Sequence, residues 1–148
     1  MIASAWHPVS GIEGPCADIS FARPQGEDLV ITMHFSLVIG LPNRDLRLLF
    51  RGALAMHWED EFPGLFPLPK ILARCSDPHW EKWAAPLHKV EGSTFLAEHR
   101  GMRPTGAPPT IAHFLLISMN DLVHVVAQED VAAEWVQGMA ETEAEAKA

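Results

Sequence analysis

Residues 110–136 constrain the fold most, because two apolar runs, a turn pair and a change of spacing follow one another without a break. The apolar runs, residues 111–118 and 122–127, flank the pair Asn120-Asp121. Runs of this length that are rich in branched side chains are typical of buried strands, and a two-residue loop containing Asn favours an antiparallel hairpin. Residues 129–136 then take up helical spacing. We therefore predict a hairpin followed by a C-terminal helix.

The predicted hairpin is apolar on both faces except at His113 and His124, so we expect it in the middle of the sheet or beneath the helix. With residues 120–121 as the loop, Ser118 pairs with Val123. The two histidines then lie on the same face and come close across the hairpin. We interpret them as hydrogen-bonded residues near the edge of the core rather than as a metal site.

Two earlier segments, residues 27–38 and 45–59, alternate between apolar and polar residues. A period of two is the spacing of half-buried strands. Antiparallel pairing about the turn between them places Ser36 near Arg47 and makes the two polar faces coincide. The second segment is long for a single strand, and we expect it to bend at Gly52.

Shorter signals complete the predicted fold. Residues 18–21 favour a short edge strand, residues 90–98 favour another strand, and residues 1–14 are expected to be irregular. The pattern predicts an α+β fold, with a curved antiparallel sheet of five or six strands and the C-terminal helix packed on it. With 148 residues in all, we expect one domain over residues 1–138 and a frayed acidic tail over residues 139–148.

Composition narrows the classes of partner. The chain carries a net charge of −8, which repels phosphate backbones and excludes nucleic acid as the expected ligand. The same charge favours a basic protein partner. The N-terminus lacks the features of a signal peptide, no run reaches the ~18 apolar residues of a membrane span, and Cys16 and Cys75 lack partner motifs. We therefore expect free thiols in a cytoplasmic protein that does not bind a membrane.

The sequence contains no recognisable motif for catalysis, and we expect that the protein is not an enzyme. No nucleophile signature surrounds either cysteine or Ser10, and no glycine-rich loop links a strand to a helix for a cofactor. His57, Glu59 and Glu61 alternate onto one face at a strand end, a set that metal ions accept. No spaced partner motif accompanies them, so we interpret the set as a solvated acidic strand end and expect neither metal nor cofactor.

The longest irregular region is the proline- and tryptophan-rich segment of residues 62–83. Loops of this length are uncommon unless they have a role. Trp58, just before the segment, is expected to cover the sheet. The tryptophans within the segment either cover an open face of the sheet as well or, if exposed, anchor a partner in acidic surroundings. The candidate partner-binding residues are therefore aromatic and acidic: Glu59, Asp60, Glu61, Trp80, Glu81 and Trp83.

Residues 112–136 (AHFLLISMNDLVHVVAQEDVAAEWV) are similar to the C-terminal strand–turn–strand–helix of small bacterial immunity proteins, which neutralise secreted toxins. The long alternating segment, followed by the sequence WEDE and a proline-rich loop, resembles the same class. The resemblance implies a cytoplasmic, non-enzymatic protein that binds and occludes a cognate toxin. It specifies neither the toxin nor the residues that bind it.

The alternative is a small-molecule or metal-binding protein in which the curved sheet surrounds a pocket. The polar faces of the two alternating segments would supply its lining, namely His34, Arg47, Arg51 and His57.

Overall fold

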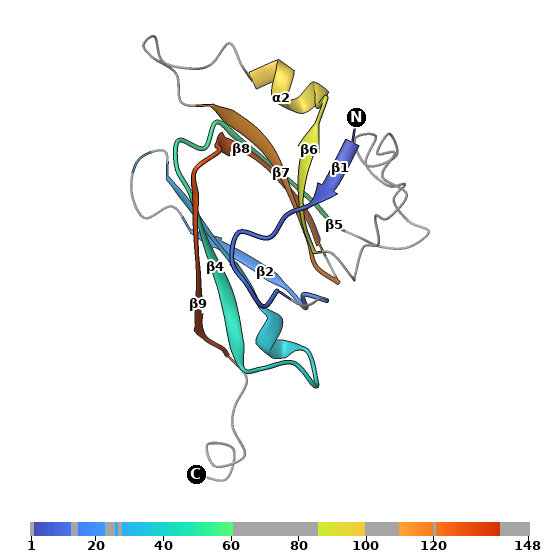
Figure 1. Cartoon of the computed structure of the whole chain (residues 1–148), viewed down its shortest axis with the longest axis vertical. Coiled ribbons are helices and arrows are strands. Elements are labelled where there is room, and N and C mark those ends of the chain that lie inside the picture. The colour runs from blue at the N-terminus through green and yellow to red at the C-terminus, as the bar shows by residue number, and fades with distance from the viewer. Residues whose placement is uncertain are drawn as a thin grey trace.

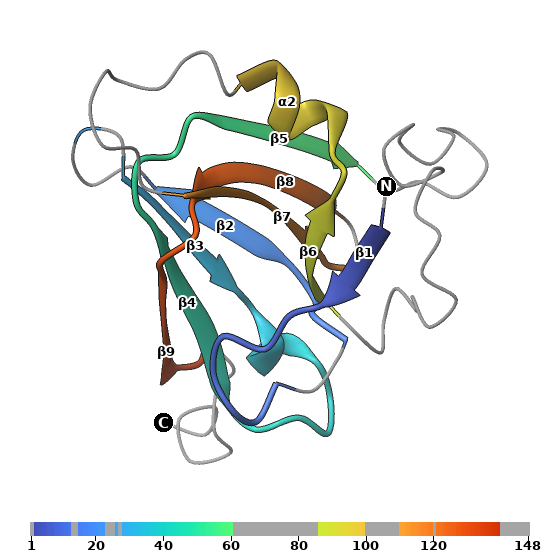
Figure 2. The ribbon, with the colours of Figure 1, turned by 45° about the horizontal axis from the view of Figure 1, so that its top comes forward.

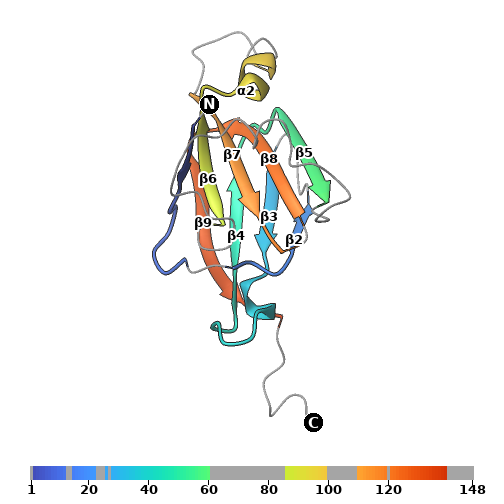
Figure 3. The same cartoon turned by 90° about the vertical axis from the view of Figure 1, so that its right-hand side faces the viewer.

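The computed structural model describes residues 2–12, 15–22, 26, 28–60, 86–99, 110–119 and 121–139. These residues form two antiparallel sheets that lie face to face (Figures 1 and 3). The five-stranded sheet has the order β1 (Ile2–Ala5), β6 (Leu87–Glu91), β7 (Ile111–Ile117), β8 (Asp121–Gln128) and β5 (Ala55–Asp60). The four-stranded sheet has the order β2 (Ile19–Ala22), β3 (Leu29–Met33), β4 (Arg44–Phe50) and β9 (Val131–Gln137).

Two short helices accompany the sheets in the described part of the chain. The 3-10 helix η1 (Phe35–Leu37) follows β3, and α2 (Thr94–His99) follows β6. Figure 2 shows α2 over the five-stranded sheet, where it lies against β7 and β8. No helix among the described residues is both long enough and apolar enough to cross a membrane.

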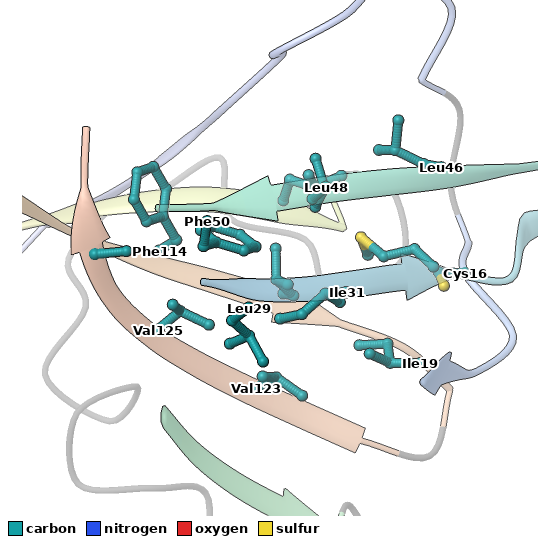
Figure 4. Packing of buried hydrophobic residues seen from close by; sticks show 14 of the residues in the cluster. Cys16, Ile19, Leu29, Ile31, Leu46, Leu48, Phe50, Phe114, Val123 and Val125 are labelled. Carbon is teal, nitrogen blue, oxygen red and sulfur yellow. The ribbon is translucent and has the colours of Figure 1, made fainter. Parts of the chain in front are cut away.

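The main core lies between the two sheets, because strands of both sheets direct alternate apolar side chains toward the other sheet. Phe50 of β4 and Phe114 of β7 meet there with ring centroids 5.3 Å apart, and Trp6 adds a third ring 4.6 Å from Phe114. Most of the other contributors in Figure 4 are fully buried aliphatic side chains, including Leu29, Ile31, Leu46, Leu48, Val123 and Val125. Packing of this kind excludes water and holds the sheets together.

The central position of the predicted hairpin is confirmed, since β7 and β8 are inner strands of the five-stranded sheet. Its predicted register is wrong by two residues: Leu116 is the partner of Val123, and the hairpin closes where the Ser118 N–H donates to the Asp121 carbonyl at 2.9 Å. An even shift leaves every side chain on its predicted face, because successive side chains alternate.

The predicted C-terminal helix is wrong. Val131–Gln137 forms β9, which pairs with β4 at the edge of the four-stranded sheet. Val131 and Trp135 are four residues apart, a spacing that shares one face in a helix and one face in a strand as well. The partly buried Val131, Ala133 and Trp135 pack against the core, while Ala132 and Glu134 are exposed. Antiparallel sheets are therefore confirmed, but a single curved sheet with a C-terminal helix packed on it is not.

The long alternating segment divides between the two sheets. Its first part is β4 and its second part is β5, and Gly52 between them has a φ of +56°. The expected bend at Gly52 is thus a crossing from one sheet to the other, and glycine adopts this left-handed conformation at little cost. The predicted pairing of the preceding strand is wrong by four residues, because Arg47 lies opposite Thr32 rather than Ser36.

The remaining strand predictions are confirmed only in part. β2 is an edge strand close to its predicted position. The expectation of an irregular N-terminus is wrong, because β1 pairs with β6 there. The strand predicted over residues 90–98 is wrong beyond Glu91, where Ser93 and α2 follow instead. Of the predicted tail, Met139 alone lies within the described residues.

Candidate functional site

The predicted partner-binding residues are placed only in part. Glu59 and Asp60 belong to β5, opposite Leu122 and Asp121 of β8. The remaining candidates lie outside the described residues: Glu61, Trp80, Glu81 and Trp83. Two of the predicted partner-binding residues therefore lie on an edge strand of the five-stranded sheet.

Two exposed aromatic residues, Phe21 and Trp58, form what we call the aromatic rim. Phe21 lies on β2, one edge strand of the four-stranded sheet, and Trp58 lies on β5, one edge strand of the five-stranded sheet. Their ring centroids are 5.8 Å apart in an edge-to-face arrangement. Phe21 is 43% exposed and Trp58 is 50% exposed. The Trp58 indole N–H donates to Asp121 Oδ1 at 2.8 Å, which fixes the ring. Trp58 was expected to cover the sheet, but as an edge residue it leaves half of its surface open.

Three side chains on the outer face of the four-stranded sheet form what we call the Ser–His–Asp relay. Ser20 Oγ lies 2.8 Å from His34 Nε2, and His34 Nδ1 lies 2.9 Å from Asp45 Oδ2. A carboxylate only accepts hydrogen bonds, so Nδ1 carries the imidazole proton and donates it to Asp45. In the neutral imidazole Nε2 is then the acceptor, and the Ser20 hydroxyl donates to it.

Neighbouring strands position the relay. Ser20 lies on β2, opposite Thr32 of β3. His34 follows Met33 of β3 and Asp45 precedes Leu46 of β4, so His34 and Asp45 lie next to the Met33–Leu46 pair. The His34 backbone is held by its N–H, which donates to the Asp18 carbonyl at 2.8 Å. His34 and Asp45 are buried, at 7% and 2% exposure, whereas Ser20 is exposed.

A backbone contact also fixes the carboxylate of the relay. The Ser36 N–H in η1 donates to Asp45 Oδ1 at 3.0 Å, so both carboxylate oxygens accept a hydrogen bond. Ser36 Oγ in turn accepts the Met139 N–H at 3.0 Å. Asp45 is therefore held from two sides, and its orientation toward His34 is determined before any ligand arrives.

The four residues named for the alternative pocket do not gather at one place. Arg47 of β4 and Arg51, directly after β4, are exposed. Arg47 pairs with Glu134 of β9, and Arg51 pairs with Asp130, directly before β9. His34 is committed to the relay. His57 belongs to the other sheet, so these four side chains do not converge. Their separation follows from the division of residues 45–59 between the two sheets, so these residues do not form one continuous polar face.

A second histidine group lies under α2, on the face of the five-stranded sheet that points away from the main core. His113 Nε2 and His124 Nδ1 are 2.9 Å apart, which confirms the predicted approach of these residues across the hairpin. Ser93 Oγ lies 2.6 Å from His113 Nδ1, and the Phe95 ring lies 5.3 Å from the His113 ring. Both histidines are fully buried.

Burial favours the neutral form of both imidazoles. Desolvation lowers the pKa of His113 from 6.5 to about 4. Desolvation, with smaller contributions from His113 and His57, lowers the pKa of His124 to about 3. His57 is near, with its ring 6.1 Å from that of His124. Even so, the described residues contain no group of three or more His, Cys, Asp or Glu side chains arranged to hold a metal ion.

The possible metal ligands at residues 57–61 are described only in part. Glu61 lies outside the described residues, so the structure does not test that set. Cys16 is buried, its Sγ donates to the Asp18 carbonyl at 3.2 Å, and burial raises the pKa of its thiol well above the usual range. A thiol in this state is a poor nucleophile. Cys75 lies outside the described residues.

Comparison of the chain with protein-family models, with curated proteins and with solved structures found no match.

Proposed function

We propose that the chain is an immunity-type protein that binds a basic toxin and occludes it. Binding would start at the aromatic rim of Phe21 and Trp58 and continue through the acidic residues that follow Trp58 in the sequence. The observation that carries the proposal is the exposed, ordered aromatic pair across the edge strands of the two sheets.

Aromatic side chains at such a position favour binding for a physical reason. Tryptophan dominates protein–protein hot spots because it removes a large area from water while losing few rotamers. The Trp58 indole is already held by Asp121 and by the Phe21 ring. A partner that covers the rim therefore loses less conformational entropy than it would by ordering free side chains.

The charge of the chain favours a basic partner. Trp58 is followed directly by Glu59, Asp60 and Glu61, and the whole chain carries a net charge of −8. Complementary charge steers the encounter of two proteins and selects against acidic partners. Trp80, Glu81 and Trp83, which the sequence offers as further anchors, are proposed to bind the same partner.

Co-expression with the product of the neighbouring gene tests this function. We expect that product to be lethal alone and harmless in the presence of the wild-type chain. The double variant Phe21→Ala/Trp58→Ala should fail to protect, because it removes both rings of the rim. The matched control is Met139→Ala, which truncates an exposed apolar residue beyond β9, at the opposite edge of the four-stranded sheet from β2. A harmless neighbour that never co-purifies with the chain would refute the proposal.

A further inference from the structure

We propose that Ser20 is a nucleophile toward acyl esters, with His34 as its general base and Asp45 as the residue that positions His34. This inference goes beyond occlusion of a partner and departs from the expectation that the chain is not an enzyme. It rests on the Ser–His–Asp relay, in which each of the two hydrogen bonds joins the atoms that nucleophilic catalysis requires.

The relay has the burial that such chemistry needs. The nucleophilic oxygen must reach a substrate, and Ser20 is exposed on an edge strand. The base must hold one tautomer, and the buried Asp45 carboxylate keeps the proton of His34 on Nδ1. His34 Nε2 is thereby left as the acceptor at 2.8 Å from Ser20 Oγ, within the range for proton transfer.

The edge strand also offers a donor for the negative charge that develops during acyl transfer. His34 N–H donates to the Asp18 carbonyl, which sets the alternation of the β2–β3 ladder. By this alternation Ser20 directs its N–H toward β3, and Ile19 and Phe21 direct theirs toward the free edge. The Ile19 N–H donates to Asp18 Oδ1 at 2.9 Å. The Phe21 N–H, directly after the nucleophile, is therefore assigned to the ester oxyanion.

The reaction balances with the ester and water alone. Ser20 Oγ bonds to the carbonyl carbon while its proton passes to His34 Nε2. The tetrahedral intermediate then collapses, the carbon–oxygen bond to the alcohol breaks, and His34 returns the proton to the leaving oxygen. Water, deprotonated by His34 in the same way, releases the acid and regenerates the Ser20 hydroxyl.

A fluorophosphonate probe tests the nucleophile on the full chain without knowledge of the natural ester. Its reaction joins Ser20 Oγ to phosphorus and expels fluoride, and the Ser20 proton leaves through His34. Mass spectrometry should find one adduct, on Ser20, formed at least ~100 times faster than any adduct on Ser4, since a positioned general base contributes 10²–10⁴-fold. Ser4 is the matched control, an exposed serine on the edge strand β1. No adduct on Ser20 at saturating probe, or a rate equal to that of Ser4, would overturn the proposal.

Variants separate chemistry from structure. Ser20→Ala should abolish the adduct and the release of p-nitrophenol from p-nitrophenyl acetate, while Ser4→Ala should change neither. Asp45→Asn should slow labelling on the order of 10²-fold or more. The Ser36 N–H retains the amide oxygen, so the amide nitrogen faces His34 Nδ1 and drives the imidazole proton to Nε2. Nitrogen-15 NMR should record this change of tautomer, which a merely structural role would not produce.

The relay and the binding function fail separately. Trp58→Ala removes a ring of the aromatic rim outside the relay and should not change labelling of Ser20, and Ser20→Ala should not change protection from a toxin. Unchanged labelling in folded Asp45→Asn, or in folded His34→Gln, would overturn the assigned roles.

Discussion

His113 Nε2 lies 2.9 Å from His124 Nδ1 in a fully buried position beneath α2, so two imidazoles share one hydrogen bond away from water. Desolvation keeps both rings neutral, with pKa values lowered to about 4 for His113 and about 3 for His124. In the unfolded chain each ring binds a proton near pH 6.5. The unfolded state therefore binds more protons than the folded state between about pH 3 and pH 6.5.

The free energy of unfolding should accordingly be highest above pH 6.5 and should fall as the pH decreases from 6.5 toward 3. His124→Leu removes one titrating group, so the free energy of unfolding of this variant should change less steeply with pH. The decrease in slope should correspond to at most one bound proton. Leu115→Ala, next to His124 on the same face, should lower stability by a similar amount at every pH. Urea denaturation at a series of pH values measures this. Equal slopes for wild type and His124→Leu would contradict the neutral, buried pair.

The packing of the two sheets predicts a coupling between Phe50 and Phe114. Their rings meet across the interface at 5.3 Å, and such pairs contribute about 0.5–1.5 kcal/mol beyond burial. A double-mutant cycle of Phe50→Leu and Phe114→Leu should therefore show a coupling of about this size. The control cycle, Phe50→Leu with Leu115→Ala, should be additive within about 0.5 kcal/mol, because Leu115 points to the other face of its sheet. Additivity in both cycles would argue against sheets that pack face to face.

The crossing between sheets predicts an unequal pair of glycine substitutions. Gly52 and Gly26 both have a φ of +56°, so alanine meets the same backbone strain at each, about 1–2 kcal/mol. A Cβ at Gly52 would in addition lie 2.7 Å from Gln128 Nε2, whereas a Cβ at Gly26 meets nothing within 4 Å. Thermal or urea denaturation should therefore find Gly52→Ala the less stable variant. Equal losses would mean that the contact with Gln128 has no energetic role.

How far the fold was predictable follows from the period of two. Alternation identifies which face of a strand a residue occupies, and the predicted faces of these strands are confirmed. Both register errors, at Arg47 and at Leu116, are even shifts that leave the faces unchanged. Alternation does not identify the partner residue or the sheet. It therefore concealed the crossing at Gly52, and it did not distinguish a strand from a helix at Val131 and Trp135, which are four residues apart.

The same limit explains the candidate site. His113 and His124 were predicted to meet because they belong to one local hairpin, where even a shifted register keeps them close. The Ser–His–Asp relay was missed because it needs the true pairing of three strands. Its only sequence signal was a serine in a predicted edge strand and a histidine and an aspartate on polar faces. Four candidate partner-binding residues stay a prediction, because they lie outside the described residues: Glu61, Trp80, Glu81 and Trp83.

The most direct test of the proposed function is the affinity of the purified chain for the product of its neighbouring gene. Calorimetric titration should give a tight complex with the wild type, and Trp58→Ala should weaken it by at least ~30-fold, the loss of about 2 kcal/mol that defines a hot spot. Met139→Ala should bind as the wild type does. A complex whose dissociation constant is the same for wild type, Trp58→Ala and Phe21→Ala would contradict binding through the aromatic rim.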